Sequence, residues 1–339
     1  MTEVGAYTAK DFASSQDVRW CPGCGDYAIL KSVQKVLPQL GVPKENIVFV
    51  SGIGCSSRFP FYVDTFGFHT LHGRAPTIAS GIKTLRPDLD VWLVTGDGDG
   101  FSIGGNHLIH LLRRNFSIKV LLFNNRIYGL TKGQYSPTSQ LGQVTKSSPL
   151  GAIDHPINPT SVALGAEASF VARTADNQLK HMEETIHRAA QHKGTAFVEI
   201  LQNCVIFNDG TWDEVTGKKT RDDHQLLLEH DKPLIYGGEQ KRGIRQRGFG
   251  VEVVDLADEQ ATDGLVVHDE RATDPAYAFM LSRLGVDSGP TPLGVFRQNE
   301  RPCYEAVAQD ELRAAQERAA GLSLDDMYRG FGKVSTWEV

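Results

Sequence analysis

The chain has 339 residues, of which 40% are apolar and 22% charged, and its formal net charge is −6. This length allows one large domain with an extension and a sizeable core. The charge balance is that of an ordinary soluble protein and gives no indication of nucleic-acid or membrane binding. The polar segment 1–20 lacks the apolar core of a signal peptide, and no apolar run approaches a transmembrane helix in length. We therefore expect a cytoplasmic protein.

Amphipathic segments and short β-branched apolar runs alternate along the first two thirds of the chain. The pattern predicts helices at 26–37, 75–85, 106–115 and 177–192, and buried strands at 47–50, 91–95, 118–123, 168–172 and 196–201. Pro76 suits the first turn of the helix at 75–85. Such alternation is typical of an α/β fold with a doubly wound, mostly parallel sheet.

The pattern changes after Asn208. Residues 209–247 are rich in glycine and charged side chains and show little apolar periodicity. A short strand is predicted at 248–254, and helices are predicted at 274–284 and 304–319. We therefore expect an α/β domain over residues 1–206, followed by a C-terminal arm and extension over 207–339 that contacts other subunits.

Two of the predicted strands end in polar turns. The strand at 91–95 runs into Gly96-Asp97-Gly98-Asp99, and the strand at 118–123 runs into Asn124-Asn125-Arg126-Ile127-Tyr128. In a βαβ unit both loops open at the same edge of the sheet, where open α/β sheets bind ligands. The two polar turns, whose residues 97 and 125 are 28 positions apart, are therefore expected to meet in space.

The residue types in these turns suit a magnesium-bound diphosphate. Mg²⁺ takes oxygen ligands and commonly binds one or two protein side chains together with substrate phosphates. Asp97 offers a carboxylate, Asn125 an amide oxygen and Ile127 a backbone oxygen. The glycines at 96, 98 and 100 allow the main chain to approach a diphosphate closely. A lone Gly-Asp-Gly is usually an ordinary turn, but the second loop favours the metal site.

Four of the five cysteines lie in turns or directly after predicted strands. Cys21 and Cys24 form a Cys-x-x-Cys pair, which alone fits a redox dithiol, half of a zinc site or half of an iron-sulfur site. Cys55 and Cys204 each follow a strand, at the edge that carries the expected magnesium ligands. Four thiolates gathered there would suit zinc or an iron-sulfur cluster, and spacing alone does not separate the two. Cys303 is interpreted as a spare thiol.

Together these residues resemble the thiamine diphosphate signature, in which a Gly-Asp-Gly is followed after a spacer by an Asn-rich loop. Within that superfamily, the segments 96–104 (Gly-Asp-Gly-Asp-Gly-Phe-Ser-Ile-Gly) and 127–134 (Ile-Tyr-Gly-Leu-Thr-Lys-Gly-Gln) resemble the beta subunit of 2-oxoacid:ferredoxin oxidoreductases. These enzymes oxidatively decarboxylate a 2-oxo acid onto coenzyme A and pass electrons to ferredoxin. The resemblance is strong through residue 206 and weaker to residue 310.

The resemblance implies a fold of the thiamine diphosphate-binding type, with thiamine diphosphate, Mg²⁺ and one 4Fe-4S cluster as cofactors and coenzyme A as co-substrate. The cluster ligands would be Cys21, Cys24, Cys55 and Cys204. Because the chain has room for only one such α/β domain, an alpha subunit is expected to bring the pyrimidine-binding domain. Two alpha-beta pairs would assemble, and an external ferredoxin would take the electrons.

The residues expected to contact the cofactor lie in loops at strand ends: Ile53, Gly54, Cys55, Ser56, His72, Gly96, Gly98, Asp99, Gly129 and Leu130. Two candidate catalytic residues are His72, which precedes the helix at 75–85, and Lys132, which follows the metal loop. His69 and Arg74 are interpreted as parts of a solvated loop. An exposed lysine without a role explains Lys132 equally well.

The segment 128–138 resembles family members that use 2-oxoglutarate, whereas pyruvate-specific relatives tend to carry an Asn-Thr-Gly pattern there. A pyruvate-specific or broad-range enzyme is the alternative within the family. Outside it, a non-redox thiamine diphosphate decarboxylase or synthase would not need the four cysteines. The other alternative outside the family is a non-catalytic four-cysteine zinc module on an α/β scaffold, an interaction protein.

Overall fold

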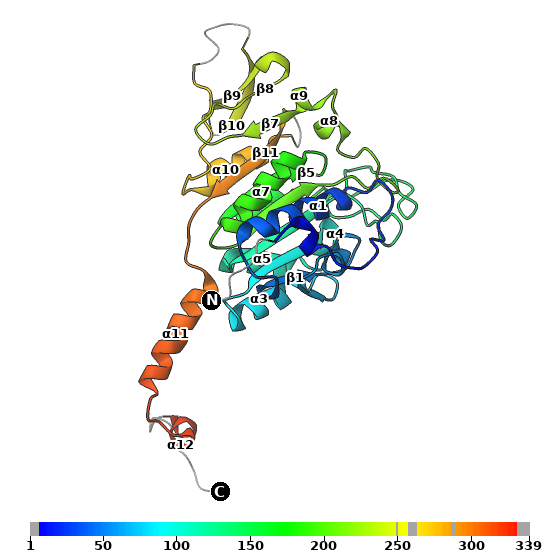
Figure 1. Ribbon diagram of the computed structural model, residues 1–339. Helices are drawn as coiled ribbons and strands as arrows, with labels where there is room; N and C mark the ends of the chain where they lie inside the picture. The colour runs from blue at the N-terminus through cyan, green and yellow to red at the C-terminus, as the bar shows by residue number, and fades with distance from the viewer. Residues whose placement is uncertain (1–6, 249, 257–262, 286–288, 331–339) are drawn as a thin grey trace.

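The computed structural model describes residues 7–248, 250–256, 263–285 and 289–330. Two parts of the predicted segments lie outside these ranges: residues 1–6 of the polar N-terminal segment and residue 249 of the strand predicted at 248–254. The centre of the fold is an eight-stranded sheet of order β2-β1-β3-β4-β6-β5-β11-β7 (Figure 1). Its strands are β1 (Ile47–Ser51), β2 (Phe66–His69), β3 (Asp90–Gly96), β4 (Ile118–Asn124), β5 (Phe170–Ala175), β6 (Ala196–Leu201), β7 (Gln225–Leu228) and β11 (Thr291–Gln298). Every neighbouring pair is parallel except β5 and β11. The predicted doubly wound, mostly parallel sheet is therefore confirmed.

Helices cover both faces of this sheet, as its buried strands require. One face carries α3 (Ala75–Leu85), α5 (Gly105–Arg114), α6 (Pro159–Gly165) and α10 (Pro275–Ser282), and the other carries α1 (Asp26–Val36), α2 (Phe59–Tyr62) and α7 (Leu179–Gln191). The remaining helices are α4 (Asp97–Phe101), α8 (Asp213–Thr216), α9 (Arg221–His224), α11 (Tyr304–Arg318) and α12 (Leu324–Tyr328). No described helix is both long enough and apolar enough to cross a membrane.

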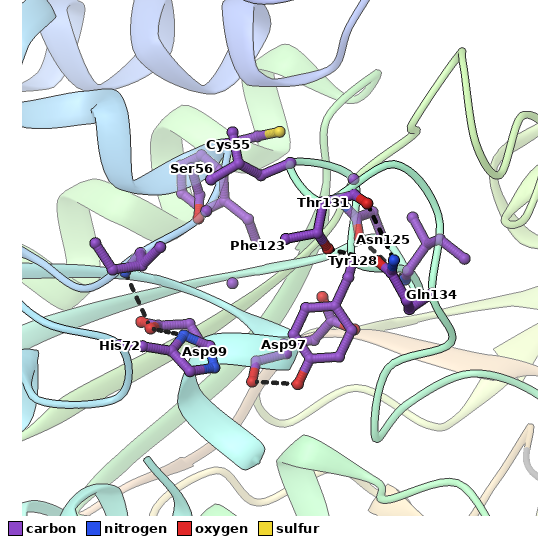
Figure 2. A pocket seen from close by; sticks show the side chains of 17 residues that line it. Cys55, Ser56, His72, Asp97, Asp99, Phe123, Asn125, Tyr128, Thr131 and Gln134 are labelled. Atoms are coloured by element: carbon purple, nitrogen blue, oxygen red, sulfur yellow. Dashed lines mark hydrogen bonds and ion pairs between the residues drawn. The ribbon is translucent and has the colours of Figure 1, made fainter. Parts of the chain in front are cut away.

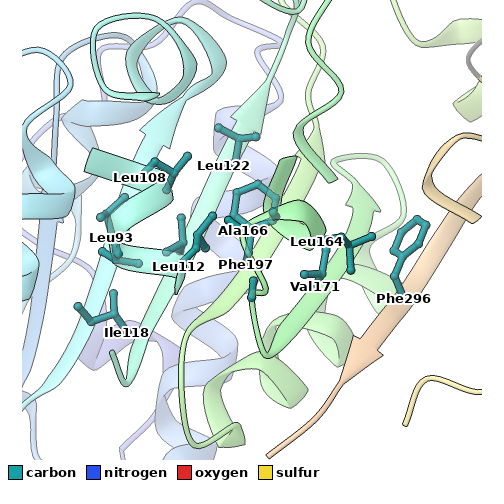
Figure 3. Packing of buried hydrophobic residues seen from close by; sticks show 14 of the residues in the cluster. Leu93, Leu108, Leu112, Ile118, Leu122, Leu164, Ala166, Val171, Phe197 and Phe296 are labelled. Atoms are coloured by element: carbon teal, nitrogen blue, oxygen red, sulfur yellow. The ribbon is translucent and has the colours of Figure 1, made fainter. Parts of the chain in front are cut away.

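Alternate residues along a strand belong to two different hydrophobic clusters, one on each face of the main sheet. In β3, Val91 and Leu93 join the cluster under α3 and α5, whereas Trp92 and Val94 join the cluster under α1 and α7. Figure 3 shows the first cluster running from Leu93 and Ile118 across the sheet to Phe296. The buried central strands β1, β3, β4 and β6 fix the positions of the loops that leave them.

The sheet continues beyond residue 206, which the sequence did not predict. Strands β7 and β11 complete its far edge, and Phe296 of β11 is fully buried. The predicted strand at 168–172 is β5, shifted to Phe170–Ala175. Residues 207–339 are thus not only an arm, although their proposed contacts with other subunits stay a prediction.

Two parts of the C-terminal region lie outside the main layers. Strands β8 (Ile235–Tyr236), β9 (Arg242–Arg247) and β10 (Gly250–Asp255) form a separate antiparallel sheet. Helix α11 projects away from the body and leads to α12 (Figure 1). Its Val307 and Leu312 are about half exposed, at 45% and 50%.

The burial of β11 predicts that the C-terminal region contributes to the stability of the whole sheet. Replacing Phe296 by alanine should lower the free energy of unfolding by about 3–5 kcal/mol, because it removes a fully buried ring from the core. Denaturant unfolding followed by circular dichroism measures this loss. The matched change Val307→Ala on exposed α11 should stay within about 0.5 kcal/mol of wild type. Equal effects at the two positions would show that β11 is not part of the cooperative core.

Candidate active site

The loops that follow β1, β3 and β4 surround one cavity at the carboxyl edge of the sheet. Its volume is about 480 Å³, and Figure 2 shows the side chains that line it. All ten residues predicted to contact the cofactor line it, and so do the three predicted magnesium ligands, Asp97, Asn125 and Ile127. The parallel arrangement of β1, β3 and β4 thus brings together residues that are far apart in the sequence.

Asp97 is the buried carboxylate of the cavity, with 2% of its surface exposed. Its Oδ2 accepts hydrogen bonds from Ser136 Oγ at 2.5 Å and from Thr138 Oγ1 at 2.6 Å. Burial raises the pKa of Asp97, and these two hydrogen bonds oppose the rise. A divalent cation would favour the charged carboxylate further, so Asp97 fits a magnesium ligand.

Asn125 is held in a fixed orientation beside Asp97. Its Nδ2 donates to Gln202 Oε1 at 2.8 Å, and its Oδ1 accepts from the backbone N–H of Ile127 at 3.1 Å. A side-chain amide oxygen has two lone pairs, so Oδ1 can still accept a second partner. The amide therefore fits a ligand whose orientation is set before a metal binds.

Gly98 is required by the close approach of Tyr128. The Tyr128 hydroxyl donates to the Gly98 carbonyl at 2.9 Å, and a Cβ at position 98 would lie 2.2 Å from the Tyr128 ring. Helix α4, which follows β3, and the loop after β4 are therefore in direct contact across the cavity. A side chain at position 98 would push Tyr128 away.

Asp99 holds three loops together rather than leaving its carboxylate free for a ligand. Its Oδ1 accepts from the backbone N–H groups of Ile53 at 3.0 Å and Gly73 at 2.7 Å, and its Oδ2 accepts from Thr95 Oγ1 at 2.6 Å. The side chain of His72 lies against the same carboxylate, with Nδ1 3.0 Å from Oδ1 (Figure 2). Asp99 lines the cavity but acts as a positioning residue for its walls.

The two candidate catalytic residues differ in their positions. His72 lines the cavity, and the centroid of its ring lies 6.3 Å from that of Tyr128. Lys132 is exposed, has a positive φ of 77°, and is not among the residues that line the cavity. The structure thus brings His72 to the site and leaves Lys132 outside it, and both catalytic roles stay predictions.

Sequence analysis missed several residues of the site. Phe123, Tyr128, Thr131 and Gln134 line the cavity, and Ser136 and Thr138 support Asp97 from behind. The sequence of the polar Ser136-Pro137-Thr138 segment indicates only a resemblance to 2-oxoglutarate enzymes. Its hydrogen bonds span 39 and 41 residues, so no local pattern predicts them.

The Cys-x-x-Cys loop folds over the same edge of the sheet. The backbone N–H of Gly25 donates to Asn203 O at 3.3 Å, and Gln202 Nε2 lies 3.3 Å from Cys24 Sγ. The loop of Cys21 and Cys24 therefore lies against the segment that carries Cys204.

Gly129 and Cys55 both line the cavity, and Gly129 also lies close to the thiols of Cys55 and Cys204. A Cβ at this position would lie 3.5 Å from Cys55 Sγ and 3.6 Å from Cys204 Sγ. Burial raises the pKa of the free Cys55 thiol to about 12 and also raises the pKa values of Cys24 and Cys204. A bound metal cation would stabilise the thiolate forms and so lower these raised pKa values. The buried cysteines therefore fit the ligands of a metal cluster.

Two comparisons with known sequences fit this site. Residues 52–200 match the model of the thiamine pyrophosphate enzyme C-terminal TPP-binding domain. The 2-oxoglutarate oxidoreductase subunit KorB of Mycobacterium tuberculosis is 55% identical over 311 residues, which cover 91% of this chain and 83% of that protein. The 2-oxoacid:ferredoxin oxidoreductase subunit beta of Saccharolobus solfataricus is 46% identical over 244 residues, 66% of this chain and 80% of that protein. The chain belongs to the family of 2-oxoacid:ferredoxin oxidoreductase beta subunits.

A solved structure extends the family likeness over nearly the whole chain. The 2-oxoglutarate:ferredoxin oxidoreductase from Magnetococcus marinus, with 2-oxoglutarate, coenzyme A and succinyl-CoA bound, superposes with a TM-score of 0.76 at 32% identity and covers 98% of both chains. The fold predicted from the thiamine diphosphate resemblance and the family itself are thereby confirmed. This chain is an oxidoreductase subunit.

The contacts of Asp99 predict a structural role for its charge in this beta subunit. Asp99→Asn should lower the free energy of unfolding by about 2 kcal/mol, because hydrogen bonds to a charged acceptor are replaced by weaker ones. Urea unfolding measures the loss. The control Asp17→Asn alters an exposed carboxylate and should change stability by less than about 0.5 kcal/mol. If Asp99→Asn leaves the free energy of unfolding unchanged, the charge of Asp99 has no role in joining the loops.

Proposed function

We propose that this chain is the beta subunit of a 2-oxoglutarate:ferredoxin oxidoreductase, which converts 2-oxoglutarate and coenzyme A to succinyl-CoA and CO₂ or runs the reverse reductive carboxylation. The observation that carries the proposal is the position of Gly129. Gly129 lines the diphosphate cavity, and a Cβ at this position would lie 3.5 Å from Cys55 Sγ and 3.6 Å from Cys204 Sγ. This contact supports a redox enzyme in preference to a non-redox decarboxylase or synthase.

In this proposal, Asp97, Asn125 and the backbone oxygen of Ile127 would hold Mg²⁺, which would neutralise the charge of the diphosphate. Thiamine diphosphate, when bound, supplies the nucleophilic carbon for attack on the 2-oxo acid. The chain's own residues bind and orient: the glycines at 96 and 98 let the backbone approach, and Ile53 to Ser56 form the wall towards the thiols. His72 faces the same space and is the candidate for proton transfer.

The four cysteines Cys21, Cys24, Cys55 and Cys204 would hold one 4Fe-4S cluster, which carries single electrons. Within the described part of the chain, no group of three or more histidine, cysteine, aspartate or glutamate side chains is arranged to hold a single metal ion. A tetrahedral zinc site needs sulfur atoms about 2.3 Å from one centre. Four thiolates suit zinc as well as an iron-sulfur cluster, so the metal content of the complex separates the two.

The substrate assignment rests on resemblance and on the names of relatives. The relatives from Mycobacterium tuberculosis, Archaeoglobus fulgidus and Magnetococcus marinus are all named for 2-oxoglutarate. An alpha subunit would supply the pyrimidine-binding domain, two alpha-beta pairs would assemble, and ferredoxin would accept the electrons. A cytoplasmic location completes the proposal, since free thiols persist in a reducing compartment.

A substrate panel tests the assignment. The chain, purified anaerobically with its alpha partner, should reduce a viologen dye with 2-oxoglutarate and coenzyme A at least tenfold faster than with pyruvate. Omission of coenzyme A should abolish the sustained rate. A preference for pyruvate would overturn the 2-oxoglutarate assignment, and absence of any acceptor reduction would overturn the redox function.

The cluster is tested by one ligand and one matched cysteine. Cys204→Ser should remove most of the broad visible absorbance and reduce the iron content of the anaerobic complex, because serine is a poor ligand for a cluster normally held by thiolates. Cys303→Ser changes the cysteine interpreted as a spare thiol and should retain both. A colourless wild-type complex that contains zinc would contradict the proposal.

A further inference from the structure

A second cavity borders the same segment as the diphosphate cavity. Phe123, Asn125 and Ile127 line the diphosphate cavity, whereas the alternate residues Asn124 and Arg126 line the second one. This second cavity has a volume of about 150 Å³. The function proposed above assigns no role to it.

Arg126 reaches this cavity from an unusual backbone conformation. Its φ is 57°, in the left-handed region that is unfavourable for residues with a Cβ. Ser139 Oγ donates to its carbonyl at 2.6 Å and holds this conformation in place. The guanidinium stacks over the Trp212 ring at 3.6 Å from the centroid. Such conformations often persist at functional sites, where surrounding contacts maintain them.

The guanidinium of Arg126 has few partners for its five N–H donors. Among the described residues, its one hydrogen bond is a long one of 3.4 Å to Thr211 O. The nearby carboxylate of Glu199 is already used by Arg173 Nε at 2.7 Å, by Thr160 Oγ1 at 2.7 Å and by Asn124 Nδ2 at 2.7 Å. Arg126 therefore retains donors for a ligand.

A second cation lines the cavity at the end of α10. Arg283 makes no side-chain hydrogen bond or ion pair within the described part of the chain. The charged residues that line the cavity are Arg126, Arg173, Arg283 and Glu199, so its net charge is +2 if all four are ionised. We propose that this cavity binds a small dianion, such as inorganic phosphate or a short dicarboxylate, through Arg126 and Arg283.

Size and charge together define the ligand class. A volume of 150 Å³ equals that of roughly five water molecules in the liquid, which suits phosphate or a dicarboxylate of four or five carbons. Coenzyme A and thiamine diphosphate are too large for it. Arginine pairs well with both phosphate and carboxylate, because its planar fork can bind either in a bidentate manner.

The cavity is connected to the magnesium site by Thr138. This residue lines the second cavity, and its Oγ1 donates to Asp97 Oδ2 at 2.6 Å and lies 2.9 Å from Asn124 Oδ1. A dianion bound beside Thr138 would stabilise the loop that supports Asp97. Occupancy of the second cavity is therefore expected to strengthen retention of thiamine diphosphate in the neighbouring one.

Calorimetric titration tests the site directly. The complex of this chain with its alpha partner is first saturated with thiamine diphosphate and Mg²⁺, so that the diphosphate cavity is filled. It is then titrated with phosphate and, separately, with succinate, each against chloride at equal ionic strength. We expect dianion binding that chloride does not reproduce, and the tighter of the two dianions identifies the ligand.

Two variants and one control decide the outcome. Arg283→Gln and Arg126→Gln should each weaken dianion binding about tenfold or more, through loss of a charge-assisted pair. Arg271→Gln removes an exposed arginine that does not line the cavity and should bind like wild type. If Arg126→Gln fails to fold, the exposed Arg283→Gln decides alone. Absence of dianion-specific binding, or binding that Arg283→Gln leaves unchanged, overturns the proposal whether or not the complex oxidises 2-oxoglutarate.

Discussion

Parallel pairing of β1, β3, β4 and β6 is the constraint on which the rest of the site depends. Each of these strands ends at the same edge of the sheet, and each is followed by a loop that carries a polar or sulfur-containing residue. Because the strands are buried on both faces, the loops start from fixed positions. Asp97, Asn125, Cys55 and Cys204 come together because of this pairing.

The loops are then joined to one another by a small number of polar contacts. Asp99 links the turn after β3 to Ile53 and Gly73, and Ser136 and Thr138 secure Asp97 from a segment that has no regular secondary structure. Buried charges of this kind are stable only when they are fully hydrogen-bonded. The result is a cavity whose walls are positioned before any cofactor binds. The same loops would place the two proposed cofactors next to each other, because Cys55 and Gly129 both line the cavity.

Sequence patterns predicted the elements whose apolar spacing is regular. The helix at 75–85 has the predicted bounds, and the strand at 196–201 does as well. Strand β11 was missed because Pro292, Gly294 and Arg297 interrupt its apolar pattern. Arg297 is nevertheless buried, since its guanidinium donates to Ala168 O and Thr273 O. Site residues placed at strand ends were predictable, whereas Ser136, Thr138 and the stacking of Arg126 on Trp212 depend on contacts between distant segments.

Gly129 also has a consequence for how this family can vary. Asn125, Ile127, Tyr128 and Gly129 border the diphosphate cavity, and a Cβ at Gly129 would lie 3.5 Å and 3.6 Å from two of the four thiols. A substitution at position 129 must be compatible with both the diphosphate cavity and the thiols. Few neutral substitutions are therefore expected at this position. In a relative that lacks the four cysteines, position 129 would have to be compatible with the diphosphate cavity alone. Bulkier residues at position 129 should therefore mark relatives that have lost electron transfer while keeping the diphosphate site.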